Sequence, residues 1–235
     1  MTTIRSRIPL FGTREDWSET VVSILGALGV TFLYVLVAEQ LGTTTSWLEI
    51  WSLVFSFSCV WLSRSENIFS MHAGIIASVL TGVFLFRIDV VAQAWLQFLF
   101  FVPIQLYGWW HWCRGGEART ELAITNLTRK GWVKWLIIYC LIWLTCMWVF
   151  SIVYSQPQYL LWDTSIVGAS VLAQMLMTLK KIECWLIWII PVNVSSAAFF
   201  VVTDVSAFVL MYVVFLVNAS LAYRNWLLTF ERENG

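Results

Sequence analysis

The segment "ECWLIWIIPVN" at residues 183–193 places aromatic and amide side chains inside a hydrophobic run. On a helix Trp185 and Trp188 lie within about 60° of each other, and Asn193 lies about 80° to the other side of Trp185. Pro191 removes a backbone donor, which can bend the helix and free a carbonyl oxygen for a cavity. These residues predict a site for a flat, polar molecule. The alternative for Trp185 and Trp188 is membership of the aromatic belt at the membrane surface.

Other polar side chains also interrupt hydrophobic runs. Asp163 and Gln174 are eleven positions apart, which places them on nearly one helical face about 16 Å apart. Gln97 and Gln105 lie in another run, and Asn218 lies in the last one. A buried amide needs a hydrogen-bond partner. Either a ligand or a neighbouring helix can supply that partner, and both alternatives stay open for each residue.

The sequence lacks the motifs of several other chemistries. His72 and His111 have no Cys or carboxylate at ligand spacing, so we expect no metal site. The five cysteines form no CxxC pair, which predicts buried or reduced thiols. The motifs GxxxxGK[ST], GxSxG and HExxH are absent. We therefore expect no catalytic residues and no cofactor, and the protein is not predicted to be an enzyme.

The composition predicts an integral membrane protein. Hydrophobic residues make up 60% of the chain, charged residues make up 12%, and the mean hydropathy is +0.77. A membrane helix needs about 17 to 25 apolar residues. Eight spans meet this requirement: 21–37, 46–62, 68–86, 90–112, 132–154, 162–179, 184–202 and 205–222. Their continuous runs favour helices over a barrel.

The charges favour one orientation of these spans. If the N-terminus is cytoplasmic, every Lys and Arg except Arg87 falls on the cytoplasmic side, including Arg5 and Arg7. This bias predicts that both termini are cytoplasmic. The outer loops are acidic and could attract a cationic solute, or acidic residues are merely tolerated there: Glu39, Glu49, Asp89, Asp163 and Asp204. No carboxylate lies near a predicted helix centre, which favours a passive pathway.

The spans also form an internal repeat. Trp47–Trp112 and Trp162–Trp226 each contain three spans and end in aromatic and small residues. Two parallel three-helix units need one linker helix between them, and 132–154 supplies it. We therefore predict an all-α membrane protein with one extra N-terminal helix followed by 3+1+3 helices. The single membrane domain, 1–235, divides into 1–45, the first repeat 46–113, the linker 132–154 and the second repeat 162–226.

Three stretches carry a resemblance to a known family. "LYGWWHW", "LWDTSIVGASVLAQMLMTLKKIECWLIWIIPVNV" and "YRNW" resemble the PnuC family of bacterial vitamin transporters, best known for nicotinamide riboside. The similarity runs from about Trp47 to Trp226. Cys184 stands where the family usually has Asn, and Pro191 enters a helix that often lacks it, so the local helix geometry departs from the family pattern.

The resemblance implies a SWEET-like fold that binds its substrate between the two three-helix units. It implies facilitated diffusion by alternating access, trapping of the vitamin by cytosolic phosphorylation, a bacterial inner-membrane location and a homotrimer. Relatives carry thiamine or riboflavin, so the cargo stays open. An intramembrane enzyme and a structural subunit are the competing classes.

The resemblance also suggests roles for individual residues. Trp185 and Trp188 would stack on the nicotinamide ring, where cation–π attraction contributes roughly 0.5 to 2 kcal/mol. Asn193 would bond the carboxamide or the ribose, and Gln174 a ribose hydroxyl. Tyr107 and Trp110, within "YGWW", would form an inner aromatic gate or belong to the aromatic belt.

Overall fold

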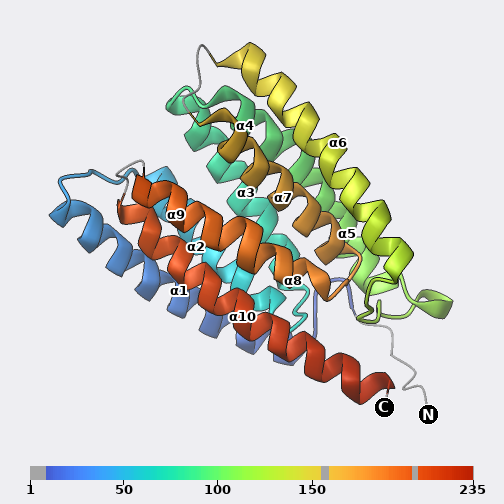
Figure 1. Cartoon of the computed structure of the whole chain (residues 1–235). Helices are drawn as coiled ribbons and strands as arrows, with labels where there is room; N and C mark the ends of the chain where they lie inside the picture. The colour runs from blue at the N-terminus through green and yellow to red at the C-terminus, as the bar shows by residue number, and fades with distance from the viewer. Residues whose placement is uncertain (1–8, 155–158, 203–205, 235) are drawn as a thin grey trace.

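The computed structural model describes residues 9–154, 159–202 and 206–234, and this part of the chain forms a bundle of helices (Figure 1). The predicted charges Arg5, Arg7 and Asp204 lie outside the described residues. The elements are α1 (Arg14–Gln40), α2 (Trp47–Ser63), α3 (Phe69–Arg87), α4 (Val91–Leu96), η1 (Gln97–Phe101), α5 (Val102–Arg114), η2 (Glu117–Arg119), α6 (Arg129–Val153), α7 (Leu160–Thr178), α8 (Glu183–Ile187), η3 (Trp188–Val194), α9 (Ser195–Val202) and α10 (Ser206–Asn234).

The helices account for all eight predicted spans. Seven are long and apolar enough to cross a membrane, with 91–114 and 183–202 each counted as one span. The eighth, α2, is apolar but only 17 residues long. The prediction of an all-α membrane protein is therefore confirmed.

Side-chain caps explain where several helices begin. The Thr13 hydroxyl accepts a hydrogen bond from the Asp16 backbone N–H, and the Asp16 carboxylate accepts one from the Thr13 N–H. This capping box satisfies two backbone donors, so α1 begins at Arg14, before the predicted start at Val21. Ser46 and Glu49 form the same arrangement at the start of α2.

Two spans contain wider, π-helical turns. Within 91–114, the Val102 N–H donates to the Gln97 carbonyl five residues back, directly before Pro103. Within 183–202, the Ser195 N–H donates to the Ile190 carbonyl, and Pro191 lies in the same turn. Proline has no N–H and clashes with the regular helical ladder, and π-helical turns are frequent at functional sites.

The helices form two halves, which we define as the N-terminal half (14–114) and the C-terminal half (129–234). In the N-terminal half α1 packs on α2, and in the C-terminal half α6 packs on α7. Figure 1 shows α1 beside α10 at one edge of the bundle and α6 at the opposite edge. The two halves therefore have corresponding helix packing.

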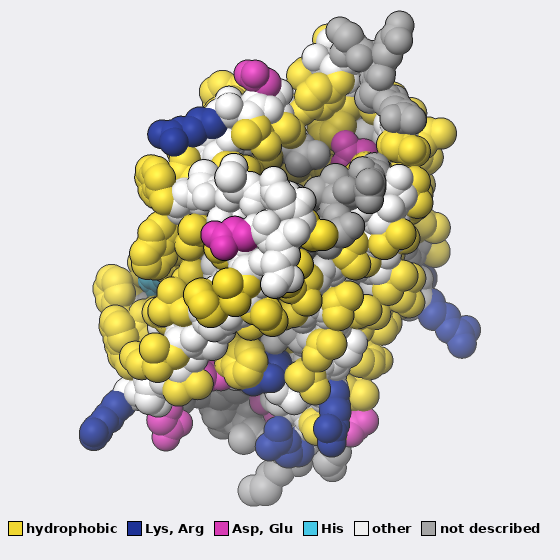
Figure 2. Space-filling model, turned by 90° about the vertical axis from the view of Figure 1, so that its left-hand side faces the viewer, with side chains coloured by type: hydrophobic (Ala, Val, Ile, Leu, Met, Phe, Trp, Pro, Cys, Tyr) yellow, Lys and Arg dark blue, Asp and Glu magenta, His cyan; other side chains and the backbone are white. Residues whose placement is uncertain are grey.

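Basic residues gather at one end of the bundle. The start of α1, the α2–α3 and α7–α8 turns and the end of α10 all lie there (Figure 1). Every described Lys and Arg except Arg87, which ends α3, lies at or near this end. Figure 2 shows hydrophobic side chains around the visible face and most of its basic side chains toward one end. We call it the basic end.

Candidate functional site

A cavity of about 370 Å³ lies between the two halves. Its lining comes from α2, α3 and the 91–114 span on one side, and from α7, the 183–202 span and α10 on the other. Among the described residues, α1 and α6 contribute nothing to this lining. The cavity extends from Asp163 in the first turn of α7 to Met177 in its last turn, about 20 Å along the helix. A cavity of this size accommodates a small organic molecule.

Seven of the ten predicted site residues line this cavity. Two glutamines come from the 91–114 span, and one aspartate and one glutamine come from α7. Two tryptophans and one asparagine come from the 183–202 span. These residues are Gln97, Gln105, Asp163, Gln174, Trp185, Trp188 and Asn193.

The other three predicted residues lie elsewhere. The side chains of Tyr107 and Trp110 are 45% and 54% exposed on α5, and the Tyr107 ring stacks on His111 at a centroid distance of 5.1 Å. Asn218 Nδ2 donates to the Val60 carbonyl on α2 at 2.9 Å, which is an interhelical hydrogen bond. The structure therefore does not bring these three side chains into the cavity lining.

The two indoles of the 183–202 span contribute unpaired donors to the cavity. Trp185 is 1% exposed and lies edge-on to Trp226 at a centroid distance of 5.4 Å, so it does not face lipid. The Nε1 atoms of Trp185 and Trp188 are buried without a hydrogen-bond partner among the described residues. Buried polar atoms are usually paired. A ligand with acceptor atoms would satisfy these groups.

Buried amides lie on both sides of the cavity. Gln105, Gln174 and Asn193 are buried side chains. The Gln105 amide lies directly against Gly74 of α3, where even a Cβ atom would overlap it. The glycine therefore provides the space in which this amide sits, and an amide can both donate and accept hydrogen bonds.

The ionisable side chains of the described cavity lining favour a negative charge. Among its described lining residues Asp163 is the only ionisable carboxylate, and there is no Lys, Arg or His. Burial strengthens the interaction of a charge with an opposite charge nearby. The cavity therefore favours neutral or cationic molecules over anions.

Sequence analysis missed several lining residues. Ser196 lies three positions after Asn193 and therefore on nearly the same helical face, so spacing was an available signal. Ser170 and Tyr212 also line the cavity. Serine is common in membrane helices, and residues 207–217 around Tyr212 contain no other polar side chain, so no sequence signal distinguished these two.

Comparison with known proteins agrees with this architecture. The model of the nicotinamide mononucleotide transporter family matches residues 46–228. The nicotinamide riboside transporter PnuC of Escherichia coli is 29% identical over 219 residues, covering 83% of this chain and 90% of that protein. The transporter of the same name from Neisseria mucosa is 25% identical over 225 residues, covering 92% of this chain and 82% of that protein.

A solved structure shares the fold. The crystal structure of the vitamin B3 transporter PnuC superposes with a TM-score of 0.72 at 23% identity, covering 94% of this chain and 100% of that one. The uncovered part of this chain is shorter than the 27 residues of α1, so part of α1 has a counterpart there. The family model covers most of the chain, from α2 into α10, and the chain therefore belongs to the nicotinamide mononucleotide transporter family of membrane transporters.

Proposed function

We propose that this protein transports nicotinamide riboside by facilitated diffusion. The observation that carries the proposal is the convergence of two unpaired indole N–H groups, several buried amides and one carboxylate on a single cavity between the halves. The names of the E. coli and N. mucosa relatives support the same cargo.

The proposed binding mode follows from the chemistry of the cargo. The riboside carries a flat pyridinium ring, and an indole face attracts such a cation by roughly 0.5 to 2 kcal/mol. Trp188 and Trp185 supply the indole faces, and their N–H groups donate hydrogen bonds to oxygen atoms of the cargo. Asn193 bonds the carboxamide or ribose, and Gln174 a ribose hydroxyl. Asp163 balances the positive charge of the ring.

The lining favours the riboside over the mononucleotide. A phosphate brings negative charge into the cavity, where the described lining holds no Lys, Arg or His to pair with it and one carboxylate to repel it. Burying an unpaired charge is strongly unfavourable. Thiamine, which is also cationic and aromatic, is the nearest competitor, and riboflavin, which is larger and uncharged, is a more distant one.

We further propose how the chain is arranged for transport. The regions 46–113 and 162–226 form two three-helix repeats, with 1–45 and 132–154 as the extra and linker segments of the single domain 1–235. The repeats rock against each other and expose the cavity to either side in turn. The basic end faces the cytoplasm of a bacterial inner membrane, with both termini on that side, cytosolic phosphorylation traps the riboside, and three copies associate.

Calorimetry on the detergent-solubilised protein tests the cargo. The panel contains nicotinamide riboside, nicotinamide mononucleotide, thiamine and riboflavin, and uptake of labelled riboside into proteoliposomes follows. We expect riboside to bind at least tenfold more tightly than the mononucleotide, about 1.4 kcal/mol. Tightest binding of thiamine, or equal binding of the riboside and its phosphate, would falsify the proposed cargo.

A further inference from the structure

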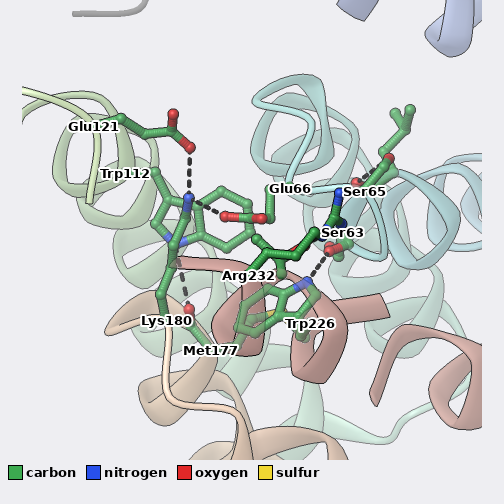
Figure 3. Close-up of polar contacts among 11 residues, drawn as sticks. Ser63, Ser65, Glu66, Trp112, Glu121, Met177, Lys180, Trp226 and Arg232 are labelled. Carbon is green, nitrogen blue, oxygen red and sulfur yellow. Dashed lines mark hydrogen bonds and ion pairs between the residues drawn. The ribbon is translucent and has the colours of Figure 1, made fainter. Parts of the chain in front are cut away.

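A buried ion-pair cluster joins the two halves at the basic end (Figure 3). Lys180, in the turn between α7 and α8, is 0% exposed. Its Nζ lies 2.7 Å from Glu66 Oε2 in the α2–α3 turn and 2.8 Å from Glu121 Oε1, which follows α5. The ammonium group also lies 4.9 Å from the ring centroid of Trp112. Lysine is almost never fully buried unless it is paired, so these charges hold Lys180 in place.

The backbone at this pair is unusual. Glu66 and Lys180 have φ angles of 60° and 47°, in the left-handed region that residues other than glycine seldom adopt. Such conformations persist only where the surrounding structure over-determines them, and they cluster at functional sites and switches. Both members of the ion pair therefore hold a conformation that the isolated turns would not favour.

Two tryptophans join the same halves beside the ion pair. Trp112 Nε1 donates to the Met177 carbonyl at 3.2 Å, and Trp226 Nε1 donates to the Ser63 carbonyl at 3.0 Å (Figure 3). Each indole crosses from the last helix of one half to the end of a helix in the other. Trp226 follows Trp112, and Met177 follows Ser63, by the same 114 positions that separate Glu66 from Lys180.

The equal spacing means that the two halves contribute equivalent residues to these contacts at the basic end. Glu66 and Lys180 are then the same position of the repeat, meeting face to face. Two like charges in equivalent positions would repel, whereas the opposite charges found here attract. The two halves therefore differ at this position, because two identical charged residues could not form the ion pair.

The cluster borders the cavity at the basic end. Trp185 and Met177 line the cavity, and Trp226 contacts both Trp185 and Trp112 at centroid distances of 5.4 and 5.9 Å. The three indoles are each 1% exposed. For a molecule in the cavity to pass this end, we infer that the indoles separate from the opposite half and that Lys180 separates from Glu66.

We propose that Lys180 and Glu66 form a latch between the halves, and that this latch opens each time cargo passes the basic end. The proposal rests on the transport function proposed above. It adds that the ion pair between these turns is one of the contacts that control access from this end.

The second carboxylate makes opening feasible. Glu121 belongs to the 120–128 segment, in which the Thr125 N–H donates to the Lys180 carbonyl and the Thr125 carbonyl accepts from the Ile182 N–H, both at 3.0 Å. The Leu122 N–H also donates to the Trp112 carbonyl of α5 at 2.9 Å, so the segment links α5 to the α7–α8 turn. The latch requires that Glu121 stays with Lys180 when Glu66 withdraws. An unpaired buried charge is thereby avoided. The side chain of Glu66 is already 14% exposed, so water can solvate it as it leaves.

Two matched variants test the latch. Glu66→Gln removes the ion pair between the halves, whereas Glu121→Gln removes an equal charge from the same lysine but keeps that pair. Each is combined with Ser170→Cys, which places a thiol on the cavity wall, after the five native cysteines are replaced by alanine. A membrane-impermeant maleimide is then added at the basic end in vesicles of known orientation, without cargo.

We expect Glu66→Gln to raise the labelling rate about tenfold over Glu121→Gln, because the population with an open basic end increases. Lys181→Met removes a neighbouring charge that makes no ion pair among the described residues, and it should label at the parental rate. Glu66→Asp keeps the charge but shortens its reach, and it should label at an intermediate rate; it also serves if Glu66→Gln is recovered in poor yield.

Equal labelling rates of the Glu66→Gln and Glu121→Gln variants would overturn the latch. If Glu66→Gln does not fold, a parental labelling rate of Glu66→Asp would overturn it instead. The proposed cargo fails in a different measurement, since it depends on riboside binding to the parental protein. The two ideas can therefore be rejected separately.

Discussion

Trp188 combines two contributions to binding that substitution can separate. Its ring lines the cavity, and its Nε1–H is buried without an acceptor among the described residues. Phenylalanine keeps an aromatic face but has no N–H group. A hydrogen bond contributes about 0.5 to 1.5 kcal/mol, so Trp188→Phe should raise the Kd for nicotinamide riboside roughly 2- to 12-fold.

Alanine removes the aromatic face as well. Adding cation–π attraction of roughly 0.5 to 2 kcal/mol gives a loss of about 1 to 3.5 kcal/mol, so Trp188→Ala should raise the Kd about 5- to 400-fold. Calorimetry on purified protein measures both values, and size-exclusion profiles check folding. Trp110, which is 54% exposed on α5, is the matched control, and Trp110→Ala should leave the Kd unchanged.

Either of two results would refute this reasoning. If Trp188→Ala binds the riboside as tightly as the parental protein, the indole does not contact the cargo. If Trp188→Phe loses as much affinity as Trp188→Ala, the aromatic face contributes nothing and the cation–π term is wrong. Thermal unfolding of both variants distinguishes a binding effect from loss of the fold.

Four further substitutions, three in the cavity lining and one outside it, are each measured by calorimetry. Asn193→Ala should weaken riboside binding about tenfold, the loss of one to two hydrogen bonds, and unchanged affinity would remove Asn193 from the site. Asp163→Asn should weaken the cationic riboside about tenfold but barely affect its uncharged dihydro form, and an equal loss for both would exclude charge pairing. Gly74→Ala should displace Gln105 and raise the Kd severalfold, whereas parental binding would show that Gln105 is dispensable. Tyr107→Ala should leave binding unchanged, since its ring lies outside the cavity lining.

The features predictable from sequence are those that the bilayer dictates. A helix must be long enough to cross the hydrocarbon core, so hydropathy located all eight spans. An amide or acid inside such a run needs a partner, which is why Gln97, Gln105 and Gln174 could be selected and do line the cavity.

Aromatic residues carried less information. Tryptophan is common in binding sites, in protein cores and at the membrane surface. Trp185 and Trp110 therefore looked alike in sequence, but Trp185 is buried beside the cavity and Trp110 is exposed. Helix rotation decides between these environments, and packing against neighbouring helices sets that rotation.

The ion pair at the basic end was not predictable from local patterns. Lys180 followed the general bias of positive residues toward one side, and the acidic residue near it in sequence is Glu183, which is not its partner in the structure. Its partner Glu66 is 114 residues away. The contact exists because the α2–α3 and α7–α8 turns meet at the basic end, a relation that only the three-dimensional arrangement reveals.

The same repeat spacing shows why the cavity is not symmetric. Gly74 precedes Trp188 by the interval that separates Glu66 from Lys180, so the proposed repeat makes the two positions equivalent. Two tryptophans would fill the space that the cargo needs, and two glycines would leave no ring for it to stack on. A symmetric framework closes the basic end, whereas a flat, asymmetric cargo requires unlike residues where it binds. Divergence between the halves should therefore concentrate at positions that contact the cargo or meet each other at the latch.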